Sequence, residues 1–144
     1  MDIRFENRDR FYVSGYSMET SEATLEQDCA MMREKYEDRL KSISDHLYFV
    51  AYMEKEVMIY LFCARTASLT PATEGAICKE IPATRCAVAT VPKGTSILAT
   101  WYAFFDAFEK ELPVLGGATI DLDYPFHIEA FDKNGGCELW IPVK

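Results

Sequence analysis

The sequence has few of the features that mark common active sites and metal sites. It contains two histidines, His46 and His127, and no G-x-S-x-G, H-E-x-x-H or phosphate-binding glycine motif. Its five cysteines form no C-x-x-C pair, and none lies at a zinc-ligand spacing from a histidine. We therefore expect free thiols, no metal, no cofactor and no catalytic residue of these familiar kinds.

Basic runs and long apolar runs are also absent. Lys and Arg number 15 against 23 Asp and Glu, which gives a formal charge of -8, and the positive residues are scattered. A field of this sign repels phosphate backbones and anionic lipids. No apolar run approaches the roughly 20 residues of a membrane span, and the N-terminal segment MDIRFENRDRF is too charged for a signal peptide. We expect a cytoplasmic protein that binds neither nucleic acid nor membrane directly.

Aromatic residues are abundant instead. The 144 residues match the usual size of one domain, and 13% of them are Phe, Trp or Tyr. This exceeds what a small core strictly needs, so some rings are candidates to line a binding site.

The first half of the chain predicts a strand, a helix and a hairpin. A β-prone run at 10–17 is interrupted by Gly15, which is typical of a bulge or bend. The hairpin combines the apolar runs 46–53 and 57–64 around Glu54-Lys55-Glu56. The helix between them has an apolar stripe at steps of three and four, formed by Leu25, Cys29, Met32, Tyr36, Leu40 and Ile43.

The second half repeats this order. A strand at 83–91 precedes a helix that begins near Thr95 or Ser96 and ends at Pro113 and Gly116-Gly117. Runs at 126–131 and 137–143 form the second hairpin, for which Asn134-Gly135 predicts a type I′ turn. The stripe of the second helix is Ile97, Trp101, Phe105, Phe108 and Leu112.

The fold class follows from this duplication. We predict one α+β domain over 1–144, built from half-repeats at about 1–64 and 83–144 that are joined by a connection at 65–82. The halves should pack with pseudo-twofold symmetry and form antiparallel sheet with two long helices. Ligand clefts often form at such seams.

Glu129 is the residue most suggestive of function. It lies within an apolar strand, after Phe126 and Ile128 and before Phe131, and neither face of that strand is purely polar. A glutamate on a solvent-facing edge is the alternative. With Asn134-Gly135 at the centre of the turn, Glu129 lies directly opposite Trp140. A shielded carboxylate beside an indole face attracts an organic cation, although Trp140 also fits plain core packing.

Four further aromatic residues are candidates for the same site. Tyr52 and Tyr60 join it if the turn at 54–56 has three residues, whereas a two-residue turn sends Tyr60 to the other face. Trp101 and Phe105 share a helical stripe, which is compatible with core or pocket.

Five segments together form a family pattern: Ala87-Val88-Ala89, Pro92-Lys93-Gly94, Glu111-Leu112-Pro113, Phe126 to Phe131, and Glu138 to Val143. They resemble the gyrase-inhibitor-like effector-binding family, whose domain also forms the C-terminus of multidrug-responsive transcription activators. The resemblance covers nearly the whole chain and is most specific in its last two strands.

The resemblance implies an aromatic pocket for lipophilic cations with a glutamate at its floor, and that glutamate falls on Glu129. The family often has tyrosine where this chain has Phe131, and Trp-Leu-Pro where it has Glu111-Leu112-Pro113, so a different selectivity is expected. The sequence shows no helix-turn-helix region, which favours a stand-alone or cassette-encoded effector module.

Three functions compete on this basis. The leading hypothesis is non-catalytic capture of a hydrophobic, cationic small molecule, as a sensor or sequestering protein. Some relatives are hydrolytic, so Glu129 as the general base of a small-molecule hydrolase is an alternative, with His127 nearby. The third is an acidic interaction module that docks or inhibits a protein partner.

Overall fold

The computed structural model describes residues 1–111 and 117–144, and it confirms the predicted α+β class. The predicted helix end at Leu112, Pro113 and Gly116 lies outside the described residues. The elements are β1 Ile3–Arg8, β2 Phe11–Thr20, α1 Leu25–Lys41, β3 Leu47–Glu54, β4 Val57–Thr66, β5 Ile77–Ile81, β6 Thr84–Thr90, α2 Ile97–Glu111, β7 His127–Phe131 and β8 Cys137–Pro142.

The strands join in one antiparallel sheet with the order β1-β6-β8-β7-β3-β4-β2-β5. The hairpins β3–β4 and β7–β8 meet at its centre, and β2 and β6 take matching places beyond them. The order is therefore the same from either end once the two halves are equated, as the predicted pseudo-twofold packing requires. The opening strands are exchanged between the halves, because β1 pairs with β6 and β5 pairs with β2.

These two outer strands were not predicted. Segment 65–82 was expected to be only a connection, but it contains β5, and the N-terminal segment before residue 10 contains β1. Both strands lie at a sheet edge and pair on one side only. Edge strands are short and carry charged side chains, so IRFENR and ICKEI lack the apolar pattern that identified the central strands.

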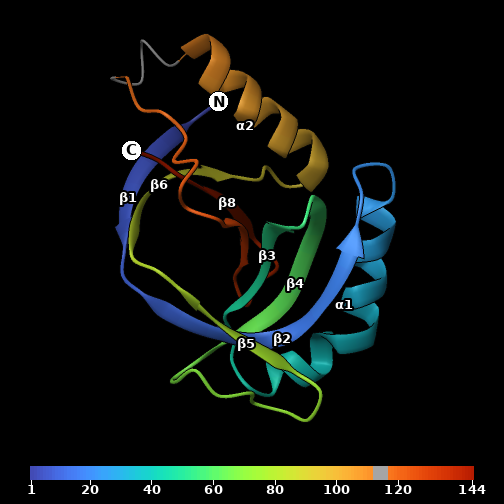
Figure 1. Ribbon diagram of the computed structural model, residues 1–144. Coiled ribbons are helices and arrows are strands. Elements are labelled where there is room, and N and C mark those ends of the chain that lie inside the picture. Colours follow the sequence, from blue (N-terminus) through green and yellow to red (C-terminus); the bar gives the residue numbers. More distant parts are fainter. Residues whose placement is uncertain (112–116) are drawn as a thin grey trace.

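The sheet is strongly curled. The rings of Phe11 in β2 and Trp140 in β8 have centroids 6.2 Å apart, although β7, β3 and β4 lie between those strands. A flat sheet would separate them by four strand spacings, or about 19 Å. Figure 1 shows the resulting bend, in which β1 and β2 sweep around β3 and β8. We call the enclosed surface, with Phe11, Tyr48 and Trp140, the concave face.

Both helices pack on the other surface, which we call the helix face. Their buried residues join one cluster with Phe49 and Tyr60 of the sheet, as the predicted stripe of α1 requires. In α2 the stripe is centred on Phe104, which is fully buried, while Phe105 is only partly buried. Of the two helices in the described residues, neither is long and apolar enough to cross a lipid bilayer.

The turn of the second hairpin differs from the prediction. The loop has three residues, 133–135, because Asp132 pairs with Gly136 and its Oδ1 accepts the backbone N–H groups of Asn134 (2.8 Å) and Gly136 (2.9 Å). A type I′ turn needs positive φ at both central residues, and here Gly135 has it (84°) but Asn134 does not. The Asp132 carboxylate therefore selects a longer loop and shifts the register by one residue.

The turn of the first hairpin has two residues, Lys55 and Glu56, both with positive φ (49° and 67°). This is the shorter of the two turns considered from the sequence. It places Tyr60 opposite Ala51, so Tyr60 and Tyr52 lie on different faces of the sheet.

Gly15 marks a close approach of strands and not the bulge that its position suggested. The pairing of β2 with β4 runs through it without a skipped residue. A Cβ at this position would overlap the carbonyl oxygen of Phe62 and lie 2.6 Å from the Cα of Cys63. Only glycine fits here without a shift of β4.

Candidate functional site

Glu129 lies at the centre of the sheet, on the face that carries the helices. It occupies the middle of β7, between Phe49 of β3 and Leu139 of β8. Its side chain is 4% exposed, which is unusual for a carboxylate. The alternation of β7 directs it toward α1 and α2, so the surrounding apolar core isolates it from bulk water.

Two aromatic side chains hydrogen-bond the carboxylate. The indole N–H of Trp101 in α2 donates to Oε2 at 2.8 Å, and the hydroxyl of Tyr60 in β4 donates to the same oxygen at 3.3 Å. None of the ion pairs formed within residues 1–111 and 117–144 includes Glu129. The group is thus held by neutral donors and lacks a bound positive charge.

Burial sets the protonation of this carboxylate. It raises the pKa of Glu129 to about 7, because desolvation outweighs the opposing effects of the bonds from Trp101 and Tyr60 and of the nearby Arg33 charge. Near neutral pH the site therefore holds a carboxyl group that is about half ionised and that gains or loses a proton easily.

Two cavities flank the indole of Trp101. The first, of about 270 Å³, contains Glu129 together with Cys29, Arg33, Phe49 and Phe131. The second, also of about 270 Å³, contains Tyr60, Phe105 and His127. They share three lining residues, Leu25, Leu98 and Trp101, so they are adjacent, and we refer to them as the two chambers of the hollow between the helices and the sheet. We call the first the Glu129 cavity and the second the Phe105 cavity.

The structure brings four of the six predicted site residues together. Trp101 and Tyr60 contact Glu129 directly, and the ring of Phe105 stacks on Trp101 with centroids 5.7 Å apart. His127 stacks beside both rings, and burial lowers its pKa below the usual value. A neutral imidazole therefore completes an apolar, ring-lined wall.

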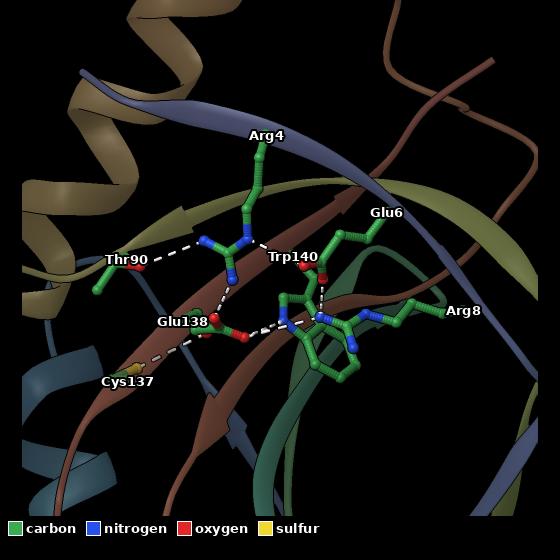
Figure 2. Close-up of polar contacts among 7 residues, drawn as sticks. All are labelled: Arg4, Glu6, Arg8, Thr90, Cys137, Glu138 and Trp140. Carbon is green, nitrogen blue, oxygen red and sulfur yellow. Dashed lines mark hydrogen bonds and ion pairs between the residues drawn. The ribbon is translucent and has the colours of Figure 1, made fainter.

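Trp140 and Tyr52 lie on the concave face instead, so the prediction that Trp140 lies opposite Glu129 is wrong. With the three-residue loop, Trp140 pairs with Ile128 and Glu129 pairs with Leu139. Figure 2 shows the indole of Trp140 beneath the guanidinium of Arg8, 4.2 Å from the ring centroid. Tyr52 packs against Phe126 on the same face.

Ion pairs surround Trp140 on the concave face. Arg4 and Arg8 of β1 both pair with Glu6 and with Glu138 of β8, as Figure 2 shows. This network connects β1 to β8 across β6 and covers the indole, which is 7% exposed. The charges are partnered within the sheet.

The residues that the structure describes offer no metal site. No three side chains of His, Cys, Asp or Glu converge within 1–111 and 117–144. The five cysteines are free, and burial raises the pKa of Cys29, the thiol in the Glu129 cavity, to about 12. That thiol is therefore protonated at neutral pH and contributes an apolar surface.

The sequence matches one known protein family over nearly its whole length. The family model of the integron-associated effector binding proteins, Cass2, matches residues 4–143. The chain belongs to the Cass2 family. No curated protein matches it in sequence.

Solved structures share the fold of this Cass2 member at low identity. The integron cassette protein VCH_CASS2 from the mobile metagenome of Vibrio cholerae superposes with a TM-score of 0.72, at 14% identity, over 99% of this chain and 95% of that one. SAV2435, solved bound to tetraphenylphosphonium, gives 0.72 at 10% identity over 100% and 94%. The C-terminal domain of EcmrR gives 0.67 at 10% identity over 99% and 97%.

One related structure contains DNA. EcmrR in its complex with DNA matches 99% of this Cass2 chain, which spans 57% of the EcmrR chain, with a TM-score of 0.64 and 12% identity. At this identity the likeness shows the fold alone. The expectation that this chain does not itself bind nucleic acid stays a prediction.

The sequence did not identify all residues that line the Glu129 cavity. Arg33 was missed because it lies beside the apolar stripe of α1, where a charged residue usually faces solvent. Cys29 was assigned only to the helix core, although it also lines the cavity. One signal was present in the spacing, since Cys29 and Arg33 are four residues apart and therefore share a helix face.

Proposed function

We propose that this protein captures hydrophobic organic cations in the hollow around Trp101, with Glu129 as the anionic partner. The observation that carries the proposal is a carboxylate that is 4% exposed, held by two aromatic donors, and without an ion-pair partner among the described residues. A buried charge of this kind is costly until a positive group neutralises it.

The cost can be expressed in energy. Raising the pKa of Glu129 from 4.5 to about 7 corresponds to about 3 kcal/mol against the ionised form. An organic cation beside the carboxylate recovers part of this, and a desolvated cation–ring contact contributes about 2 kcal/mol more. These contributions and the burial of apolar ligand surface are compatible with micromolar binding, which corresponds to about 8 kcal/mol.

The shape of the hollow supports the same ligand class. Each chamber measures about 270 Å³, and rings form much of the wall. Small-molecule sites are typically apolar clefts of about 300–1,000 Å³ with few polar groups, so the two chambers together have suitable size. Family membership and the tetraphenylphosphonium bound to SAV2435 point in the same direction.

Titration with tetraphenylphosphonium tests the proposal. Calorimetry measures the binding, and quenching of the Trp101 fluorescence provides a second readout. We expect micromolar binding at pH 8 and a loss of about tenfold or more in Glu129→Gln. Triphenylphosphine oxide provides a neutral control whose binding the substitution should hardly affect. Glu34→Gln on exposed α1 surface is the matched carboxylate control. Equal binding of the cation by the parent and by Glu129→Gln would refute the role of this carboxylate.

One observation favours a hydrolytic alternative. A carboxyl group with a pKa of about 7 in an aromatic pocket suits general-base catalysis. Incubation with reactive electrophiles such as activated esters separates the two functions, because catalysis releases product over many turnovers. Capture alone leaves the small molecule unchanged.

A further inference from the structure

A third hollow adjoins the Glu129 cavity. It measures about 520 Å³ and lies against the turn after β6 and the turn of the second hairpin, which contribute Lys93 and Gly135. Arg33, Ile97 and Phe131 line both this hollow and the Glu129 cavity. The third hollow and the Glu129 cavity therefore lie side by side at these three residues.

The two neighbouring hollows differ in the charge of their linings. The third hollow is lined by Arg33 and Lys93, and its lining within the described part of the chain includes no Asp or Glu. The Glu129 cavity shares Arg33 but adds two carboxylates, Glu129 at its floor and Glu26 at its exposed rim. The contrast stands out in a chain with a formal charge of -8.

Arg33 presents a partly exposed guanidinium to the third hollow. Its guanidinium lies over the ring of Phe131, 4.4 Å from the centroid, and Nη2 donates to Glu37 at 2.7 Å. Within residues 1–111 and 117–144 this is its one hydrogen bond, whereas a guanidinium carries five N–H donors. The side chain is 34% exposed, so solvent and ligands can reach part of it. Donors therefore remain for an anionic group.

Spacing along β7 relates the two parts of the site. Glu129 and Phe131 are alternate residues on one face of the strand, so their side chains leave the strand about 7 Å apart. The guanidinium of Arg33 lies over the second of these side chains.

We propose that the third hollow is an anion-accepting subsite, and that the preferred ligands are amphoteric. Their hydrophobic cationic part occupies the Glu129 cavity, and a carboxylate or similar anionic group contacts Arg33 and Lys93. The inference rests on the proposed function, and it adds a second recognition element of opposite sign. Glu37 neutralises part of the Arg33 charge. Lys93 forms no ion pair with any residue of 1–111 or 117–144, so it supplies the larger positive charge of the subsite.

A matched pair of small probes tests the subsite. The first is a benzyldimethylammonium group joined through five methylenes to a carboxylate, a chain whose length matches the ~7 Å spacing of the Glu129 and Phe131 side chains along β7. The second is the methyl ester of the same molecule, which keeps the cation and removes the anion. Binding of both is measured by calorimetry at pH 8 in low salt to the parent, Lys93→Gln, Arg33→Gln and Glu129→Gln.

We expect the parent to bind the carboxylate probe about threefold or more tightly than its ester. Lys93→Gln should remove that preference while leaving the ester as strong or slightly stronger. Arg33→Gln should also remove the preference, and here only the ratio of the two affinities is compared, because Arg33 lines the Glu129 cavity and its charge lowers the pKa of Glu129. Lys93 is exposed in a turn, so its substitution leaves the fold intact. Lys110→Gln, which lies 17 residues further along the chain and about 20 Å away along α2, is the charge-matched control.

Each outcome has a distinct meaning. Ester binding that depends on Glu129, without any preference for the carboxylate probe, overturns the subsite and leaves the proposed function standing. A preference for the carboxylate probe that survives both Lys93→Gln and Arg33→Gln also overturns the subsite. Binding of neither probe by a parent that binds tetraphenylphosphonium overturns the subsite alone, whereas a parent that binds none of the three cations overturns the proposed function and this inference together.

Discussion

The affinity for a permanent cation should rise with pH through about 7, because the ligand requires the ionised form of Glu129. The pKa of this group is about 7, so the ionised fraction grows from about 3% at pH 5.5 to about 97% at pH 8.5. When only the ionised form binds tightly, the apparent Kd is inversely proportional to that fraction. The affinity for tetraphenylphosphonium should then increase about 30-fold over this range, and about tenfold per pH unit below 7.

The groups that face Glu129 leave this signal readable. From α1, the Cys29 thiol, with a pKa of about 12, stays neutral. From β4, burial raises the pKa of Tyr60 and keeps its hydroxyl protonated. On β7 itself, burial lowers the pKa of His127, so its protonation affects binding only at the acidic end.

Calorimetry in buffers of constant ionic strength provides the measurement, with tetraphenylphosphonium as a ligand that does not titrate. Glu129→Gln keeps His127 and every other neighbour, so the difference between the two profiles isolates the carboxylate. Proton release on binding near pH 6.5, detected as a buffer-dependent enthalpy, is a second readout. A parent profile that is flat within twofold, or one that Glu129→Gln reproduces, would refute the reasoning.

Further predictions concern the donor, the register, the strand contact and stability. Trp101→Phe keeps a ring but removes the 2.8 Å bond to Glu129, so the midpoint of the binding profile should rise by about one pH unit or more. Trp140→Phe should leave cation affinity unchanged within twofold and lower the free energy of unfolding by about 1–2 kcal/mol, because this residue packs on the concave face. Gly15→Ala should cost about 2 kcal/mol or more in urea denaturation, since its Cβ meets the backbone of β4. The unfolding free energy of the parent, relative to Glu129→Gln, should fall by about 3 kcal/mol as pH rises from 4.5 to 7 and stay constant above, because an acid with a raised folded-state pKa destabilises the fold once it ionises.

Hydrophobic periodicity in the sequence predicted the helices and the central strands that pack against them. The stripe from Leu25 to Leu40 and the apolar runs of the two hairpins carry a signal because each must bury one face. The same signal is missing from β1 and β5, whose partners come from the opposite half of the chain. No local pattern indicates such an exchange, which is a property of the closed sheet.

The sequence predicted the positions of the residues that depend on burial, but not the position of Trp140, which depends on the length of a turn. Glu129 stands out as a charge in an apolar strand, and Trp101 lies on a regular helical stripe. The position of Trp140 depended on a competition within the loop, between the Asn134-Gly135 preference for type I′ and the Asp132 carboxylate that binds two backbone N–H groups. A change of one residue in loop length moves every following side chain to the other face.

That register also determines which groups lie beside the Glu129 carboxylate, and therefore its protonation. Had Trp140 faced Glu129, an indole from β8 would lie beside the carboxylate; instead Leu139 takes that place, and the donors come from α2 and β4. Two neutral donors and an apolar floor are too weak to keep the group ionised, so at neutral pH about half of the molecules hold a proton there. Under the proposed function, the proton stabilises the pocket without ligand, and an arriving cation replaces it. The proposal then attributes selectivity for cations to the exchange of one positive charge for another, and the limits on size and hydrophobicity to the rings.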